Sequence, residues 1–108
     1  MSSGKEVQYL YLTTRGRKTG QPREIEIWFT ANNGRYYIIA EYATSKWLQN
    51  LRAHPKVEVR VGDNQFPATA RVLSDERDGE LVRTVQELSR TKYGWGDGLV
   101  VELLPQSL

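Results

Sequence analysis

The sequence predicts a mainly β fold of the α+β class: a small closed or split antiparallel barrel of about six strands, with two helices outside it. Three observations support this prediction. Many apolar residues follow a period of two, the connections between segments have hairpin length, and only two segments show helical spacing. This order of segments rules out a doubly wound parallel sheet, because parallel strands need long crossover connections. With 108 residues, the chain is expected to form one domain over residues 1–108.

Six segments are expected to form strands, because their side chains alternate or are almost wholly apolar and include many β-branched or aromatic residues. They are residues 7–14, 23–30, 35–40, 56–61, 65–73 and 99–104. The dipeptide Asn33-Gly34 predicts a tight hairpin between the second and third strands. Pro67 suggests that the fifth strand is an edge strand or carries a bulge, since proline has no N–H to donate.

Two segments are expected to be helical. The first begins at a cap formed by Thr44 or Ser45 and cannot continue past Pro55, so it has about two to three turns. The second covers residues 74–91, with acidic residues in its first turn and a buried apolar stripe along one side. The glycine-rich segment 94–98 ends the second helix.

Composition narrows the classes of function. Apolar residues make up 39% of the chain and charged residues 26%, and the formal net charge is +2, as in an ordinary soluble globular protein. The absence of cysteine excludes disulfides and thiolate chemistry and favours a reducing cytoplasm. The single histidine, His54, argues against a zinc site. Residues 1–6 are expected to be a flexible N-terminus, and no segment is long enough to span a membrane.

The most distinctive stretch is a basic turn between the first two predicted strands, which we define as residues 15–23. It contains four cations, two glycines and a threonine hydroxyl: Arg15, Gly16, Arg17, Lys18, Thr19, Gly20 and Arg23. Guanidinium groups and the amides of a glycine-containing turn suit a phosphate or carboxylate. The alternative is a cationic hairpin tip that only keeps the sheet edge soluble. Nucleic-acid binding is not expected, because the patch is small and the net charge is low.

Candidate binding groups also occur elsewhere in the chain. Trp47 and Asn50 lie three residues apart in the first predicted helix, so an indole and an amide are expected on one surface, although Trp47 can equally anchor the helix to the barrel. Tyr42, Tyr93 and Trp95 lie in or beside irregular segments, the usual place for binding groups. Because protein nucleophiles are scarce, an organic cofactor is the more plausible carrier of any difficult chemistry.

Two motifs together point to a known family. They are Leu12-Thr13-Thr14-x-Gly16-Arg17-Lys18-Thr19-Gly20-x-x-Arg23 and Trp47-x-x-Asn50-Leu51-x-Ala53-x-Pro55-x-Val57-x-Val59. Over about residues 9–73 the chain resembles the deazaflavin-dependent nitroreductase family. That resemblance implies the split β-barrel shared with FMN-binding oxidoreductases. It also implies use of reduced coenzyme F420 as a hydride donor, and pairing as a homodimer.

The resemblance implies eight cofactor-binding positions. They are Arg17, Lys18 and Thr19 at the phosphate, Arg23 along the cofactor, Ile39 and Ala40 beside the deazaflavin ring, and Trp47 and Asn50 at the helix start. Hydride is expected to pass to an electron-poor acceptor such as a quinone, an enone or a nitro compound. Tyr42 and Tyr93 are the candidates for the group that donates a proton to this acceptor.

Two alternatives remain open at this stage. FMN is the nearest alternative cofactor, because related barrels bind it through similar phosphate contacts. The other alternative is a non-catalytic carrier of a flavin-like anionic ligand, which Glu41 and the short loop 41–46 favour. Under each alternative the expected partner is a small molecule, with no membrane span.

Overall fold

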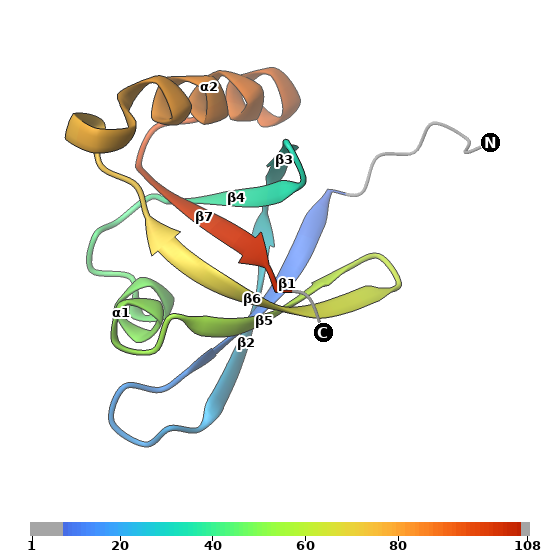
Figure 1. Ribbon diagram of the computed structural model, residues 1–108, viewed down its shortest axis with the longest axis vertical. Coiled ribbons are helices and arrows are strands. Elements are labelled where there is room, and N and C mark those ends of the chain that lie inside the picture. Colours follow the sequence, from blue (N-terminus) through green and yellow to red (C-terminus); the bar gives the residue numbers. More distant parts are fainter. Residues whose placement is uncertain (1–7, 107–108) are drawn as a thin grey trace.

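The computed structural model describes residues 8–106, which form seven strands and two helices (Figure 1). The strands are β1 (Tyr9–Arg15), β2 (Pro22–Trp28), β3 (Thr30–Asn32), β4 (Arg35–Ala40), β5 (Lys56–Val61), β6 (Asn64–Val72) and β7 (Leu99–Pro105). The helices are α1 (Lys46–Ala53), between β4 and β5, and α2 (Asp75–Tyr93), between β6 and β7. The flexible segment expected at residues 1–6 lies outside the described residues.

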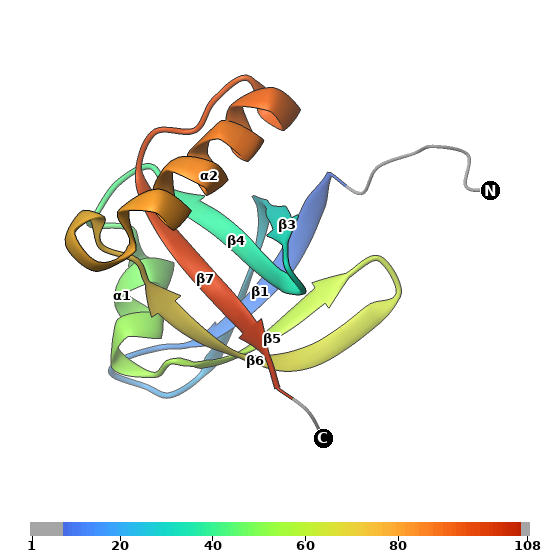
Figure 2. The same cartoon turned by 45° about the horizontal axis from the view of Figure 1, so that its top comes forward.

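All strand pairs are antiparallel, and the sheet has the order β2-β1-β5-β6-β7-β4-β3. The sheet curls into a half-barrel, with α2 lying over β4 and β7 and with α1 beside the β1–β2 hairpin (Figures 1 and 2). The predicted α+β class and split antiparallel barrel with two helices are therefore confirmed.

The expected strand over residues 23–30 is two strands, β2 and β3, separated by Phe29. These two strands are consecutive in the chain but form the two opposite edges of the sheet. The chain thus crosses the split of the barrel through one buried residue, Phe29, which is 6% exposed. The alternating pattern continues through Phe29 unchanged, so nothing local in the sequence marks this break.

The turn between β3 and β4 has the conformation that its sequence predicts. Asn33 and Gly34 both have positive φ, 53° and 77°, and join β3 to β4 as the tight hairpin that the dipeptide predicts. The expectation from Pro67 is wrong for the strand as a whole, because β6 lies between β5 and β7. Pairing of β6 with β7 runs only as far as Ala68 opposite Pro105, so Pro67 stands just beyond that ladder.

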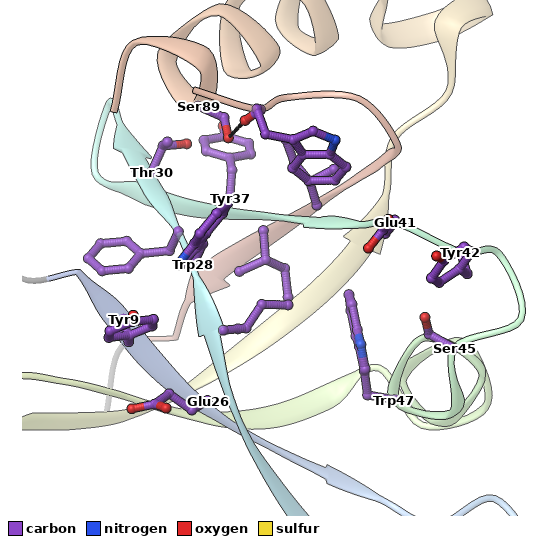
Figure 3. A pocket seen from close by; sticks show the side chains of 15 residues that line it. Tyr9, Glu26, Trp28, Thr30, Tyr37, Glu41, Tyr42, Ser45, Trp47 and Ser89 are labelled. Carbon is purple, nitrogen blue, oxygen red and sulfur yellow. Dashed lines mark hydrogen bonds between the residues drawn. The ribbon is translucent and has the colours of Figure 1, made fainter. Parts of the chain in front are cut away.

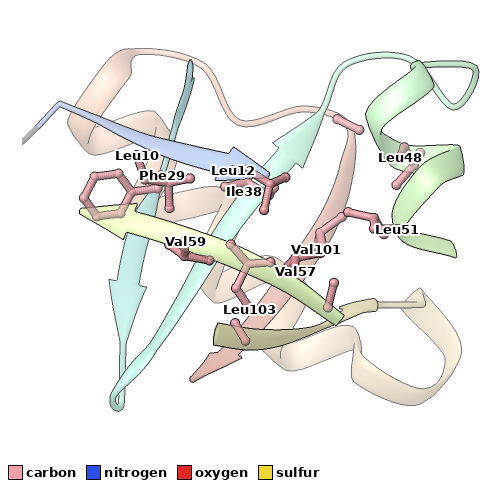
Figure 4. Close-up of a cluster of buried hydrophobic side chains, with 13 residues drawn as sticks. Leu10, Leu12, Phe29, Ile38, Leu48, Leu51, Val57, Val59, Val101 and Leu103 are labelled. Carbon is pink, nitrogen blue, oxygen red and sulfur yellow. The ribbon is translucent and has the colours of Figure 1, made fainter. Parts of the chain in front are cut away.

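The main hydrophobic core fills the inside of the barrel (Figure 4). Leu10 and Leu12 from β1, and Leu48 from α1, are each 0% exposed there. Burial of each such side chain contributes about 1.5 to 3 kcal/mol to folding. A second cluster lies beneath α2 on the outer face of the sheet and contains Tyr37, Leu73, Val82, Val85 and Val100.

The two helices begin differently. Ser45 stands at the N-cap of α1, but its side chain makes no capping hydrogen bond, so α1 depends on the burial of Leu48 and Leu51. Ser74 caps α2, because its Oγ accepts a hydrogen bond from the backbone N–H of Arg77. The helix α2 ends at Gly94, whose φ of 81° is a left-handed conformation that glycine adopts without steric cost.

Candidate functional site

A cavity of about 660 Å³ opens along the split of the barrel, within the size range of small-molecule sites of roughly 300 to 1,000 Å³. Its apolar and aromatic lining consists of Tyr9, Ile27, Trp28, Phe29, Tyr37, Ile38, Ile39, Trp47 and Trp95, and its other lining residues are Glu26, Thr30, Glu41, Tyr42, Ser45 and Ser89. Such a lining suits a flat, largely apolar ligand with a few polar atoms.

The cavity has two sides, which Figure 3 separates. On the α1 side lie Trp47 and Ser45, with Tyr42 from the loop between β4 and α1. On the α2 side lie Thr30 and Ser89, which belong to β3 and α2. We use these two names below.

The basic turn connects β1 to β2 and is closed by its own hydrogen bonds. The N–H of Gly16 donates to the carbonyl of Gln21 and the N–H of Gly20 to the carbonyl of Gly16, each over 2.8 Å. Thr19 Oγ1 accepts a hydrogen bond from the N–H of Gln21 over 3.2 Å. The turn therefore holds its shape without a ligand, although the Thr19 oxygen expected at a phosphate already accepts an internal bond.

The predicted cationic side chains of this turn remain available to an anion. Arg15, Arg17, Lys18 and Arg23 are all exposed, and within residues 8–106 no carboxylate forms a salt bridge with any of them. The hydrogen bonds that the described residues make at this turn are to uncharged groups, so the four positive charges are not neutralised there. An anionic group at this site would gain charge-assisted hydrogen bonds, which are shorter and stronger than neutral ones.

Asn50 connects the basic turn to α1. Its Oδ1 accepts a hydrogen bond from the N–H of Arg17 over 3.2 Å, and its Nδ2 donates to Thr14 Oγ1 over 3.4 Å. Asn50 is 8% exposed, so both ends of its amide are used within the protein. Trp47, one helical turn earlier, lines the cavity. Trp47 at the cavity and Asn50 at the basic turn are therefore about one helical turn apart on α1.

The remaining predicted residues divide between the cavity wall and its surroundings. Ile39 and Tyr42 line the cavity, and the Tyr42 side chain is 63% exposed. Ala40 is buried behind that wall and pairs with Leu99 of β7. Arg23 lies on β2 opposite Thr14 rather than in the cavity.

The structure places Tyr93 outside the cavity lining. Its ring stacks on Trp28, with centroids 4.4 Å apart and planes at 6°. Its hydroxyl lies 2.7 Å from the carbonyl oxygen of Gln8 and 2.8 Å from that of Phe29, and it accepts a hydrogen bond from the N–H of Phe29. The Tyr93 hydroxyl therefore satisfies backbone groups at the split of the barrel.

Sequence reasoning missed a buried polar network next to the cavity. The Glu102 side chain, only 4% exposed, accepts hydrogen bonds from Arg35, over 3.0 Å, and from the Tyr37 hydroxyl, over 3.1 Å. Arg71 Nε lies 3.4 Å from the same carboxylate. Burial, and then the charge of Glu102, raise the pKa of Tyr37 above its ordinary value. A lone carboxylate in the otherwise apolar β7 is the sequence signal that could have indicated a paired buried charge.

Thr30 and Ser89 on the α2 side were also missed, and neither has a sequence signal. Both are buried, 6% and 4% exposed, because α2 covers this part of the sheet.

The part of the chain that the structure describes holds no group of three or more metal-ligating side chains. Neither helix of that part has the length and apolar character needed to cross a membrane.

A family model named F420H(2)-dependent quinone reductase matches residues 2–97 of the chain. The chain belongs to this family. The membership confirms the deazaflavin family that the two motifs predict. The F420H(2)-dependent quinone reductases of Mycobacterium tuberculosis and of Mycobacterium bovis each share 32% identity with the chain over 90 residues. The match covers 78% of this family member but only 60% of the curated relatives' length.

Solved structures agree on the fold of this family member. An F420-H2 dependent reductase is 26% identical, with a TM-score of 0.66 over 93% of this chain and 99% of that one. The heme storage protein HutZ from Vibrio cholerae has a higher TM-score, 0.78, over 95% of this chain and 84% of its own, at 21% identity. The second similarity extends to the fold alone, so the split barrel by itself does not determine a ligand.

Proposed function

We propose that this chain binds reduced coenzyme F420 and reduces an electron-poor carbonyl compound of the quinone class. The observation that carries the proposal is that the basic turn bonds to Asn50 of α1, one helical turn from Trp47 in the wall of an aromatic-lined cavity. A cofactor with a flat ring system and an anionic tail needs both features. The activity that the relatives' names state is here a proposal for this chain.

The residues present fit such a cofactor. Arg17 and Lys18 are exposed and form no salt bridge with any residue from 8 to 106, so they would hold the phosphate and the anionic tail. Trp47 and Ile39 line the α1 side of the cavity and would contact the ring. Asn50, which bonds to the basic turn through Oδ1 and to Thr14 through Nδ2, would act by positioning the turn. When bound, reduced F420 supplies a hydride, and with one proton a quinone becomes a hydroquinone.

We propose Tyr42 as the group that donates this proton. Its side chain lines the cavity and is accessible to solvent, from which the phenol can regain its proton. The Tyr93 hydroxyl is a weaker candidate, because it lies outside the cavity lining and is hydrogen-bonded to the backbone.

We also propose a cytoplasmic location and pairing as a homodimer. The exposed Tyr9 and Trp28 beside the cavity, and a structural neighbour described as a domain-swapped dimer, support the pairing.

Tryptophan-fluorescence titration of the purified protein with F420 and, in parallel, with FMN tests the proposal. Saturation by F420 at micromolar concentration, with weaker binding of FMN, is expected. Arg17→Ala and Lys18→Ala are each expected to weaken F420 binding by roughly tenfold, the equivalent of one charge-assisted hydrogen bond. Arg83→Ala, which removes the same charge from the exposed side of α2, is the matched control.

Three other outcomes would each change the proposal. Preference for FMN would assign the chain to the flavin-using proteins of this fold. Tight F420 binding without turnover of any quinone, enone or nitro acceptor would favour the carrier alternative. Equal affinity of the Arg17→Ala, Lys18→Ala and Arg83→Ala variants would refute the anion site at the basic turn.

A further inference from the structure

The hydroxyl of Thr30 is buried in the cavity wall without a hydrogen-bond partner among the described residues. Thr30 is only 6% exposed, and its strand position is opposite Tyr37, so both side chains lie on the face of the sheet that α2 covers. An unsatisfied buried hydroxyl is costly, and native proteins rarely retain one without a reason. A valine would fill the same volume and carry no such cost.

Among the described residues, no neighbouring group on the α2 side forms a hydrogen bond with the Thr30 hydroxyl, and the hydroxyl protons of the neighbours are donated elsewhere. Ser89 Oγ donates to the backbone carbonyl of Trp95 over 2.6 Å. The Tyr37 hydroxyl donates to the buried Glu102 carboxylate over 3.1 Å. Thr30 therefore presents an unused donor and acceptor on the α2 side, where Figure 3 places it across the cavity from Trp47.

The surroundings of Thr30 define what kind of molecule it can receive. The cavity wall includes the indoles of Trp28 and Trp95, which favour a flat ring. Two carboxylates, Glu26 and Glu41, also line the cavity and disfavour an anion inside it. The basic turn is linked through Asn50 to the α1 side, so a cofactor anchored there leaves the α2 side free.

We propose that the α2 side is the acceptor subsite and that the Thr30 hydroxyl donates a hydrogen bond to a carbonyl oxygen of an uncharged, planar acceptor. This inference rests on the proposed function and assigns the recognition of its second substrate. Thr30 selects acceptors by binding the carbonyl oxygen and takes no part in proton transfer, since a hydroxyl of ordinary acidity cannot supply a proton at neutral pH.

The test compares two ligands of nearly the same shape, menadione and 2-methylnaphthalene, of which only the first carries carbonyl groups. The apo-protein labelled with ¹⁵N is titrated with each ligand, and the indole N–H signals are followed, because Trp28, Trp47 and Trp95 line the cavity. Thr30→Val is expected to weaken menadione binding by about tenfold, the loss of one hydrogen bond, and to leave 2-methylnaphthalene binding unchanged. Thr30→Ser, which keeps the hydroxyl, is expected to retain the wild-type affinity for menadione.

Equal menadione affinity for wild type and Thr30→Val would overturn the inference, as would equal losses for both ligands or no menadione binding by the wild type. If Thr30→Val does not fold, Thr30→Ala takes its place in the same comparison. The F420 titration separates this inference from the proposed function. Wild-type-like F420 binding by Thr30→Val leaves the cofactor site standing whatever the menadione result, whereas absence of F420 binding by the wild type would refute the proposed function instead.

Discussion

The backbone N–H of Arg17 donates a hydrogen bond to the side-chain oxygen of Asn50 across 33 residues of sequence. This bond fixes the basic turn against α1 and so sets the position of the turn relative to Trp47 in the cavity wall. The sequence suggested that Asn50 touches the cofactor directly. Its contacts within the protein also make it the residue that holds the basic turn against α1.

Replacement of Asn50 should therefore affect both stability and ligand binding. Asn50→Ala removes the partner of the Arg17 N–H, and we expect a loss of about 1 kcal/mol in the free energy of unfolding. F420 affinity should fall severalfold, because the turn loses its fixed position. Thr14→Val is the matched control, since it removes only the longer bond to Nδ2 and keeps the bond to Arg17. Urea denaturation and fluorescence titration measure the two quantities, and unchanged F420 affinity in Asn50→Ala would contradict the positioning role.

The two tyrosines that the sequence offers as proton donors should respond in opposite ways. Tyr93→Phe keeps the stacking on Trp28 but loses the hydrogen bonds to Phe29, so we expect about 1 kcal/mol of destabilisation and unchanged turnover of the folded enzyme. Tyr42→Phe should leave stability unchanged and lower the rate of quinone reduction. Thermal denaturation and steady-state kinetics of both variants test this. A rate loss confined to Tyr93→Phe would assign the proton to Tyr93.

Gly98 and Gly79 make a contrasting pair for a stability experiment. A Cβ on Gly98 would lie against the carbonyl oxygen of Ala40, and its φ of 130° strains any other residue. Gly98→Ala should therefore destabilise the protein by more than about 1 kcal/mol. Gly79 lies in α2 with only the flexible end of Arg83 nearby, so Gly79→Ala should stabilise by roughly 0.5 to 1 kcal/mol. Shifts of the denaturation midpoint in the same direction for both variants, relative to wild type, would refute this prediction.

Asp78 predicts a pH dependence of stability. A hydrogen bond from the N–H of Ser74, and then the Arg71 guanidinium, hold the pKa of its carboxyl below the ordinary value. A carboxyl with a lowered pKa in the folded state stabilises above the ordinary pKa of about 4, and this contribution is lost as the pH falls through the folded-state pKa. Asp78→Asn should thus lower the urea midpoint at neutral pH, and the difference from wild type should shrink on acidification.

Asp63→Asn, in the exposed β5–β6 turn, is the control for this pH series. Within residues 8–106, Asp63 makes no ion pair, so its replacement should leave the midpoint nearly constant at each pH. A difference between Asp78→Asn and wild type that persists unchanged at low pH would show that the lost interaction does not depend on charge.

Features determined by a few neighbouring residues were predictable from the sequence. The Asn33-Gly34 hairpin, the start of the second helix next to Ser74 and the exposed cations of the basic turn all follow from local conformational and charge preferences. The fold class also followed, because alternation and hairpin-length connections leave few arrangements. The family resemblance also named Trp47 and Ile39 as cofactor-binding positions, and both line the cavity.

Features that depend on how distant segments meet were not predictable. The break at Phe29 exists because β2 pairs with β1 at one edge of the sheet and β3 pairs with β4 at the other, and no local residue records that requirement. The burial of Thr30 arises from α2, which lies more than 40 residues away in the chain. The involvement of both ends of the Asn50 amide likewise depends on contacts with β1 and with the basic turn.

The break at Phe29 also determines which bonds hold the two edges of the barrel together. In a closed barrel, the wall widens only when a ladder of strand-to-strand hydrogen bonds ruptures along its length. Here the two sheet edges are joined by one residue, whose N–H and carbonyl are held by Tyr93 and whose carbonyl also binds Lys92. Because β2 and β3 are not paired with each other, these few bonds at the end of α2 and the covalent link through Phe29, rather than a strand ladder, hold the two edges together.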